Sequence, residues 1–466
     1  MQKIQELVNN FQRFFEENWR LGLSVFVVYV IFAIIWHYLW RYRLIIINDR
    51  YIKGLEGKWK LFELKFPSEN LKSPKAMEQV FASLHGVYSF GLNNREIWWN
   101  GKIEPWFSLE MVGRGNDVRF YIRCQDGQKN VVEAAFFAQY PGIEITEVPD
   151  YVNDLPEVIP NDTYDLDGTD FLLPRNDAYP IKTYEFFESP DEEKQLDPMA
   201  TLVEAASGLK EEEVMLVQIL IRPTGDPSNS RWRKEGRKII DKITGYKEPP
   251  KPPGMMAGVY QFFKNLFNAF YKPPQWGVEK KEEIRNFKMY GPGETDVMKA
   301  VDEKMAKSVF DTVIRTIYLD RKDSYTGKNF GAMMAAFGQF GTGNFNGFKP
   351  NMGTLTKGTK VGGHSRDGGK WPWNMFFRER RLVNRKRKLY RAYKEREMPR
   401  DSHARPKRLY TGQYHKLGDL HLYSSIMATH ELATIFHPPG HPIVGHKVGQ
   451  LPAKKSGPPI GLPIIE

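Results

Sequence analysis

A long apolar run lies near the start of the chain. Residues 21–40 (LGLSVFVVYVIFAIIWHYLW) contain no charged side chain, and at about 1.5 Å per helical residue such a run covers roughly the 30 Å hydrocarbon core of a bilayer. The run ends in tryptophan and tyrosine and is followed by Arg41 and Arg43, whereas a cleaved signal peptide has a shorter apolar core and a small-residue cleavage site. The pattern predicts a retained transmembrane helix after a short N-terminal segment, residues 1–20.

The charges that flank this run predict its orientation. Lysine and arginine are more frequent on the cytoplasmic side of a span. Three basic residues precede the run and four follow it: Lys3, Arg13 and Arg20, then Arg41, Arg43, Arg50 and Lys53. The excess of one charge places the C-terminal side in the cytoplasm. We therefore expect a single-pass protein of the cytoplasmic (inner) membrane with a cytoplasmic body.

Residues 55–150 predict a compact α+β module. Residues 58–66 alternate Phe62, Leu64 and Phe66 with charged neighbours, as a half-buried strand does. Ser73 and a following proline begin a helix whose apolar residues recur at helical spacing. Strands at 106–112 and 118–123, a helix at 130–139 and a strand at 143–148 complete the order β-α-β-β-α-β. That order is the ferredoxin-like arrangement, an antiparallel sheet with two helices on one face.

A second, less regular copy is predicted at residues 177–345, after an acidic linker at 151–176. Its expected strands are 181–187, 214–221 and 309–319, and its expected helices are 198–209, 293–307 and 328–340. A long insertion, residues 222–307, separates its second and third strands. The expected fold class is therefore α+β, with a transmembrane helix followed by one ferredoxin-like module and a possible second one.

The insertion contains an amphipathic segment, residues 255–271, between two proline clusters. Its apolar face carries Met256, Tyr260, Phe263, Phe267 and Phe270 at helical spacing. The apolar face of such an isolated helix must be shielded from water by another apolar surface. The alternatives are the protein's own core, a partner protein, or the membrane interface, and we predict the membrane interface because the anchor already holds the body near lipid.

Two later segments carry opposite charge. Residues 150–197 contain 14 acidic and 3 basic side chains, and residues 378–408 contain 14 basic and 4 acidic ones. The basic segment, within an expected helical region at 377–408, is a candidate for binding phosphate in nucleic acid or anionic lipid. It is also explained by a solvated helix face, or by pairing with the acidic segment inside one chain or between copies in a homo-oligomer. The candidate anion-binding residues are Arg380, Arg381, Arg385, Lys386, Arg387, Lys388 and Arg391.

No catalytic pattern is recognised. Residues 353–360 (GTLTKGTK) have threonine where a phosphate-binding loop requires lysine, and we expect residues 346–376 to form a glycine-rich loop. In the C-terminal segment, 409–466, which ends in a proline-rich tail, His430 and Glu431 begin an H-E-x-x-H pattern that Thr434 breaks. The single cysteine, Cys124, excludes a disulfide framework. We expect no catalytic, cofactor-binding or metal-binding residues, and therefore no enzyme.

Several blocks of the sequence resemble a family of bacterial membrane-anchored proteins. They include KIEPWFSLEMV, FAQYPGIEITEVPDY, LDPMATLVEAASGLKEEEVMLVQILI, FGQFGTGNFNGFKP and HELATIFHPPG, and the resemblance covers most of residues 55–466. In that family the block lies N-terminal to a type IV secretion-like, DNA-translocase-type ATPase domain. The resemblance implies a membrane-proximal adaptor of a conjugation-like or secretion-like ATPase. No Walker motif follows the HELATIFHPPG block here, so no catalytic residue is carried over, and the motor is either encoded separately or lost.

These observations together predict a non-enzymatic scaffold in the membrane. We expect it to dock a separately encoded ATPase or another subunit of a type IV secretion-like machine. The alternative is a membrane-anchored nucleic-acid-binding protein that uses residues 378–408. DNA affinity that collapses with rising salt favours the alternative, and binding to an ATPase partner alone favours the scaffold.

Overall fold

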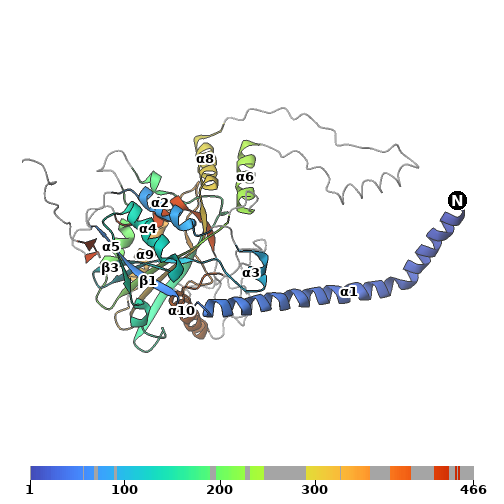
Figure 1. Cartoon of the computed structure of the whole chain (residues 1–466), viewed down its shortest axis with the longest axis horizontal. Coiled ribbons are helices and arrows are strands. Elements are labelled where there is room, and N and C mark those ends of the chain that lie inside the picture. Colours follow the sequence, from blue (N-terminus) through green and yellow to red (C-terminus); the bar gives the residue numbers. More distant parts are fainter. Residues whose placement is uncertain are drawn as a thin grey trace, which may run out of the picture.

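The computed structural model describes residues 2–55, 57–67, 72–88, 92–188, 196–225, 231–245, 290–325, 327–356, 378–399, 424–439, 447–448 and 450–451. The chain begins with one helix, α1 (Gln2–Lys53), which projects from the body (Figure 1). Within Leu23–Lys53 this helix has a window of mean hydropathy 2.0, none of which is buried. By length and composition α1 is a candidate membrane span or signal sequence.

The described body is α+β and is built on one antiparallel sheet. Its neighbouring strands run in the order β4-β1-β3-β2-β6-β7-β5-β8, and β9 pairs with β7. The short strands β10 (Lys447–Val448) and β11 (Gln450–Leu451) add parallel pairs to β3 and β1. The other strands are β1 (Trp59–Pro67), β2 (Phe107–Arg114), β3 (Asp117–Gln125), β4 (Glu144–Val148), β5 (Tyr164–Leu172), β6 (Val214–Pro223), β7 (Val309–Arg321), β8 (Lys349–Pro350) and β9 (Ser425–Ala428).

The order of the first four strands recurs in the next four. The first half of the sheet reads β4-β1-β3-β2, and the second half reads β8-β5-β7-β6. The two halves meet where β2 pairs antiparallel with β6, from Phe107 opposite Ile221 to Arg114 opposite Val214. The body therefore has one continuous sheet rather than two separate ones.

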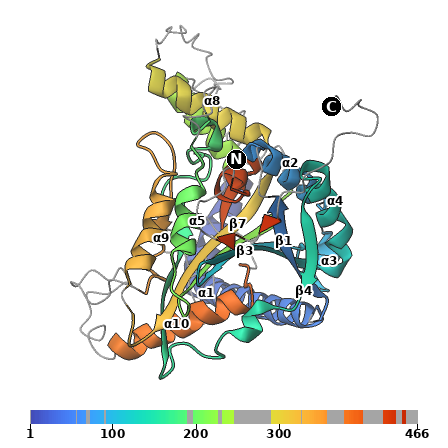
Figure 2. The same ribbon diagram turned by 90° about the vertical axis from the view of Figure 1, so that its left-hand side faces the viewer.

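Helices cover both faces of the sheet. On one face lie α2 (Pro74–His85) and α4 (Lys129–Gln139) over the first half, α5 (Ala200–Ser207) and α9 (Lys328–Gly338) over the second, and α11 (Thr429–Ile435) beside α2 (Figure 2). On the opposite face lies α10 (Arg378–Lys394). Outside these layers are α3 (Asn94–Trp98), next to α1, and the packed pair α6 (Arg231–Thr244) and α8 (Pro292–Ala306). Short 3-10 turns lie at Asp126–Gln128, Tyr151–Asp154 and Tyr184–Phe186.

The first half follows the predicted pattern closely. In β1, Phe62, Leu64 and Phe66 are buried under the helices, whereas Leu61 belongs to the cluster on the α10 face. This is the period-two alternation of a strand with two covered faces. At the start of α2, the Ser73 hydroxyl accepts a hydrogen bond from the Lys75 backbone N–H, and Pro74 takes the first helical position. Cys124 is buried in β3, as a small apolar residue would be.

The second half differs from the prediction at its first strand. The segment expected to be an acidic linker contains β5, which pairs with β7 along its length. Its polar letters, YDLDGTDFL, suggested a linker, but Asp167 and Asp170 are buried against basic partners from other elements. Gly168 permits this packing, because a Cβ there would lie 2.7 Å from the Leu389 side chain of α10.

The strand expected at residues 181–187 is not present. The backbone N–H of Ile181 donates to the Glu431 carboxylate, and that of Tyr184 donates to the Thr434 hydroxyl. The backbone donors therefore bind side chains of α11 instead of a neighbouring strand, and Tyr184–Phe186 forms a 3-10 turn.

The glycine-rich loop expected at residues 346–376 is packed over its described part. β8 pairs with β5, and the Thr354 hydroxyl accepts from the Asp170 backbone N–H at 2.8 Å. The Thr356 hydroxyl accepts from the Gly168 N–H at the same distance. These bonds satisfy the outer edge of β5, which explains why a segment without strand character is buried there.

Candidate functional site

The predicted membrane-interface residues lie outside the described residues. Met256, Tyr260, Phe263, Phe267 and Phe270 all fall within 246–289, so the structure gives no placement for the amphipathic segment.

The predicted anion-binding residues lie on α10, but they do not form one surface. Lys386 is buried and forms ion pairs with Asp165 at 2.8 Å and Asp167 at 3.6 Å. Arg385 is half-buried and donates to the Leu355 carbonyl, and Lys388 is half-buried. The acidic segment therefore supplies partners to the basic one. Four candidates are exposed: Arg380, Arg381, Arg387 and Arg391.

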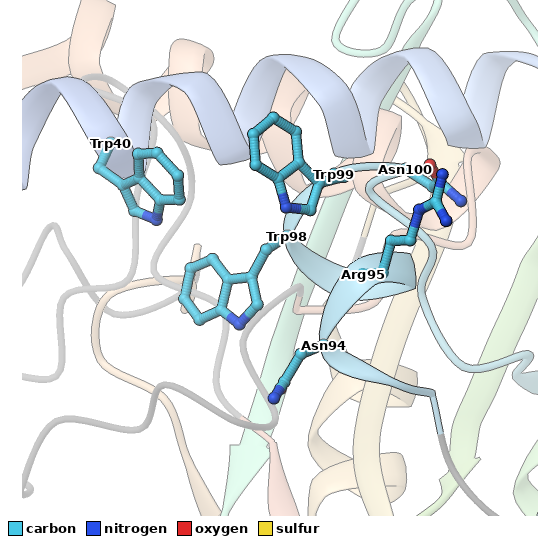
Figure 3. Close-up of a pocket in the computed structure, with 6 residues that line it drawn as sticks. All are labelled: Trp40, Asn94, Arg95, Trp98, Trp99 and Asn100. Atoms are coloured by element: carbon cyan, nitrogen blue, oxygen red, sulfur yellow. The ribbon is translucent and has the colours of Figure 1, made fainter.

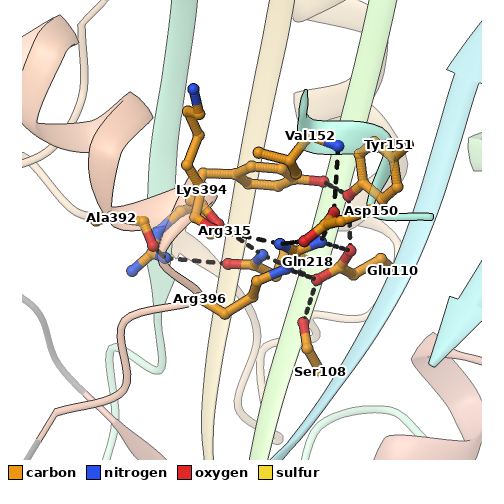
Figure 4. Close-up of polar contacts among 11 residues, drawn as sticks. Ser108, Glu110, Asp150, Tyr151, Val152, Gln218, Arg315, Ala392, Lys394 and Arg396 are labelled. Carbon is orange, nitrogen blue, oxygen red and sulfur yellow. Dashed lines mark hydrogen bonds and ion pairs between the residues drawn. The ribbon is translucent and has the colours of Figure 1, made fainter. Parts of the chain in front are cut away.

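Beneath α10, a row of polar side chains crosses the four central strands. Glu110 on β2 lies opposite Gln218 on β6, and Gln218 lies opposite Arg315 on β7. Arg315 is in turn opposite Asp170 on β5, and all four side chains are buried. Adjacent members are hydrogen-bonded: Gln218 Nε2 donates to Glu110 at 3.1 Å, and Arg315 donates to Gln218 at 3.0 Å and to Asp170 at 2.9 Å. We call this row the polar ladder. Figure 4 shows three of its members, Glu110, Gln218 and Arg315.

The polar ladder holds the C-terminal end of α10. Arg315 donates to the Ala392 carbonyl at 2.7 Å, and Gln218 donates to the Tyr393 carbonyl at 3.1 Å. Two residues beyond α10, the Arg396 guanidinium donates to both oxygens of Glu110, at 2.9 and 3.1 Å. It also donates to both oxygens of Asp150, at 2.6 and 2.8 Å. These paired contacts join α10, β2 and the end of the first half of the body.

The charge state of the ladder follows from these contacts. Burial opposes ionisation of Glu110, but the Arg396 guanidinium outweighs it and lowers the pKa of Glu110 to about 2. Glu110 is also bonded by the Ser108 and Tyr151 hydroxyls. Burial raises the pKa of Asp170 despite its contact with Arg315, and Asp170 Oδ2 has no hydrogen-bond partner among the described residues. Glu110 and Arg396 thus form a charged structural joint at neutral pH.

The broken H-E-x-x-H pattern is structural where the structure describes it. Glu431 is buried and pairs with Lys304 at 2.8 Å. His430 is also buried, and burial together with Lys307 and Lys304 holds its pKa well below its usual value. Within the described ranges, no group of three or more potential metal ligands comes together. The pattern therefore fastens α11 to α8 and to the segment before the Tyr184 turn.

A second polar and aromatic cluster lies where α1 meets the body. Arg43 of α1 donates to the Trp98 carbonyl at 3.1 Å, and its guanidinium lies 5.0 Å from the ring centres of both Trp40 and Trp99. The Trp40 and Trp98 rings are 6.2 Å apart. With Arg95 these residues form what we call the collar. All of them except Arg43 line an open pocket of about 930 Å³ (Figure 3).

The collar is fixed by local sequence on its α3 side. The Asn93 side chain caps α3 by accepting a hydrogen bond from the Glu96 backbone N–H. The Glu96 carboxylate in turn accepts a hydrogen bond from the Asn93 backbone N–H. After α3, Gly101 has φ +65°, and a Cβ there would lie 2.6 Å from the backbone of Ile47. The glycine therefore allows the end of α1 to lie directly on the body.

Sequence reasoning missed both the ladder and the collar. The ladder had a signal in β6, where Gln218 is the one polar residue inside the apolar run VMLVQILI. The collar had a weaker one, the adjacent pair Trp98 and Trp99 next to Arg95 in an otherwise polar segment. Nothing in the sequence indicated that this segment contacts Trp40.

Comparison with known proteins places the fold in a family. No match was found among curated proteins. A family model described as "Domain of unknown function (DUF8128)" matches residues 48–346, from the end of α1 through β7 and α9. The matched region contains all strands of the first half of the sheet, together with α3. In the second half it contains β5, β6 and β7. Because the matched region is more than half of the 466 residues, the chain belongs to the DUF8128 family.

Proposed function

We propose that this protein is a non-enzymatic scaffold anchored in the cytoplasmic membrane by α1, with its body in the cytoplasm. One observation carries the proposal. The apolar side chains of α1 from Leu23 to Leu39 lie outside the body, whereas the end of the helix is packed against α3 and Gly101. Exposing so many large apolar side chains to water is unfavourable, and a bilayer covers them.

The body is suited to a structural role. We propose that it consists of two ferredoxin-like modules joined edge to edge through β2 and β6. The recurring strand order, β4-β1-β3-β2 and β8-β5-β7-β6, supports this reading, as does the placement of a helix pair over each half. The buried charges of the described body tie the end of α10 to the sheet and α11 to α8, as in a rigid platform for other proteins.

For the partner, we propose a separately encoded ATPase of a type IV secretion-like or conjugation-like machine. This rests on the resemblance of the sequence blocks to the membrane-proximal part of such ATPases. A second candidate function, nucleic-acid binding, rests on the four exposed arginines of α10. It is weaker because Lys386 and Arg385 of the same helix are engaged within the body.

The membrane proposal is tested by charges placed in the centre of α1. Ile31 and Ile34 are both 51% exposed, so the double substitution Ile31→Arg/Ile34→Arg removes no contact inside the body. Each arginine at the centre of a span costs about 3 kcal/mol of insertion free energy. The variant should be extracted by alkaline carbonate, while the parent and the matched control Ile31→Leu/Ile34→Leu stay in the membrane.

Two results would overturn the membrane proposal. One is extraction of the parent protein by carbonate. The other is an intact mass showing that the mature protein lacks α1, which would make this helix a cleaved signal sequence.

The partner is tested with the full chain in lipid nanodiscs. It is titrated with the DNA-translocase-type ATPase encoded nearest its gene and, separately, with duplex DNA at low and physiological salt. The scaffold proposal expects binding of the ATPase and no salt-sensitive DNA binding. DNA affinity that falls steeply with salt and is lost on Arg380→Gln/Arg387→Gln would favour the second candidate.

A further inference from the structure

We propose that the collar is a binding site for the headgroup phosphate of anionic phospholipid, and that it fixes the body against the bilayer. This inference rests on the proposed membrane insertion of α1 and adds a second point of contact with the same membrane. It concerns Trp40 and Arg43 of α1 and Arg95, Trp98 and Trp99 of the body.

The position of the collar along α1 is the first argument. Trp40 ends the charge-free run that begins at residue 21, and those residues span roughly 30 Å of helix, the thickness of the hydrocarbon core. If this run fills the core, Trp40 lies at the headgroup level on the side of the body. Trp98 contacts Trp40, so α3 lies at that same level. Figure 1 shows α3 beside α1 on the side of the body from which the helix projects.

The composition of the collar is the second argument. Tryptophan is enriched at membrane interfaces because its ring is apolar while its N–H prefers a polar partner. The three tryptophans border the space between α1 and α3 (Figure 3), and Trp99 is 64% exposed. In water this large exposed ring is unfavourable. At the bilayer interface it is in its preferred environment.

The charge of the pocket identifies the ligand. Of the described residues that line it, none is acidic: they are Trp40, Asn94, Arg95, Trp98, Trp99 and Asn100. The one nearby carboxylate on α3, Glu96, pairs with Lys102 at 2.7 Å. Arginine side chains and asparagine amides are donors for phosphate oxygens. A pocket lined by Arg95, the Asn100 amide and three tryptophan rings therefore fits a phosphate at the boundary of the hydrocarbon.

Arg43 is positioned to contribute. Its contact with the Trp98 carbonyl uses one of the five N–H groups of the guanidinium. The two rings that flank its guanidinium, Trp40 and Trp99, line the pocket, so the guanidinium lies beside the pocket. Cation–π contact leaves the in-plane N–H groups able to donate. A phosphate bound by Arg43 and Arg95 would bridge α1 and α3, so the lipid would stop the body from swivelling about the end of the helix.

The test uses the full chain in which Cys124 is replaced by serine. A polarity-sensitive fluorophore is attached at Asn94→Cys, an exposed position next to Arg95 of the collar. The matched control position is Val158→Cys, which is exposed on the body. The protein is reconstituted in vesicles of phosphatidylglycerol and phosphatidylcholine, or of phosphatidylcholine alone. Quenching by brominated lipid reports contact with the bilayer.

We expect quenching at residue 94 and none at residue 158, with stronger quenching when phosphatidylglycerol is present. Arg95→Gln should lower the ratio of docked to undocked body about fivefold in phosphatidylglycerol vesicles, as expected for one basic residue near an anionic surface. Arg321→Gln, a change at an exposed arginine far along β7, should have no effect. Arg43→Gln should act like Arg95→Gln, and because Arg95 is exposed, its variant is expected to fold.

Three outcomes would overturn the inference. Equal responses at residues 94 and 158 in a protein that stays integrated would refute the collar site and leave the anchor proposal intact. Quenching at residue 94 that is the same in both lipid mixtures and unaffected by Arg95→Gln would refute the phosphate assignment. Extraction of the parent protein by alkaline carbonate would refute the anchor and the collar together.

Discussion

Replacing Arg396 tests whether the polar ladder is the joint that holds α10 to the sheet. The Arg396 side chain is 1% exposed and binds Glu110, which is fully buried. In Arg396→Met, a side chain of similar length fills the space but leaves the Glu110 carboxylate buried without its cation. Breaking a buried ion pair from one side costs about 3–5 kcal/mol of unfolding free energy.

The pKa of Glu110 gives a second estimate of the unfolding free energy that Arg396→Met should lose. The difference between about 2 in the folded protein and the ordinary 4.5 corresponds to about 3 kcal/mol, at 1.4 kcal/mol per pKa unit. Because the folded pKa is depressed, this stabilisation is present above pH 4.5 and is lost as the pH falls toward 2. The two routes agree on a loss of about 3 kcal/mol at neutral pH.

Arg396→Met should also reverse the way in which the contribution of Glu110 to stability depends on pH. Without Arg396, the Ser108 and Tyr151 hydroxyls still lower the pKa of Glu110, but burial, the largest influence on it, raises that pKa. Protonation of Glu110 then favours the folded state. The deficit of Arg396→Met relative to the parent should therefore shrink as the pH falls from 7 to 5. The double variant Glu110→Gln/Arg396→Met should recover part of the loss at pH 7, since no buried charge is left unpaired at that site.

The assay is urea unfolding of the full chain in detergent, followed by far-ultraviolet circular dichroism. The control is Arg391→Met on the same helix, whose ion pair with Glu395 is exposed and 4.0 Å long, and which should change stability by about 0.5 kcal/mol or less. If Arg396→Met costs no more than Arg391→Met, or if its deficit grows on acidification, the ladder does not hold α10 in the way the contacts indicate.

Three further predictions concern the junction with α1, the burial of Cys124 and the topology. Gly101→Ala should strain a left-handed residue and push its Cβ against Ile47, which should cost about 1–3 kcal/mol of stability and speed proteolysis between α1 and β1. The control Gly127→Ala has open space around the new Cβ and should not change the rate of proteolysis. Equal rates for the two variants would contradict the tight junction. Burial raises the pKa of Cys124 to about 12, so this thiol should resist a membrane-impermeant maleimide at pH 8 until the protein is denatured. Val158→Cys in a Cys124→Ser background should react only after cells are opened, and labelling in intact cells would place the body outside the cytoplasm.

Much of the first half of the body could be predicted from local pattern. Strand alternation, the Ser73 cap and the turn between β2 and β3 are properties of neighbouring residues, and each stands within a few residues of its expected place. The same kind of reasoning failed at β5, because its buried aspartates are compatible with a strand only when Arg315 and Lys386 lie against them. Those partners come from about 150 and 220 residues further along the chain.

The candidate sites show the same division. From the sequence alone came the apolar helix, the α+β class, the opposite charges of the acidic and basic segments and the positions of most helices. Only the tertiary structure decided that Lys386 and Arg396 form ion pairs inside the body. It also decided that Glu110 and Arg315 belong to one row of polar side chains, and that the ring of Trp98 contacts that of Trp40. The physical reason is that the periodicity of apolar residues indicates whether a side chain is buried. Which residues bury it depends on strand register and helix packing, and these join residues that are distant in the chain.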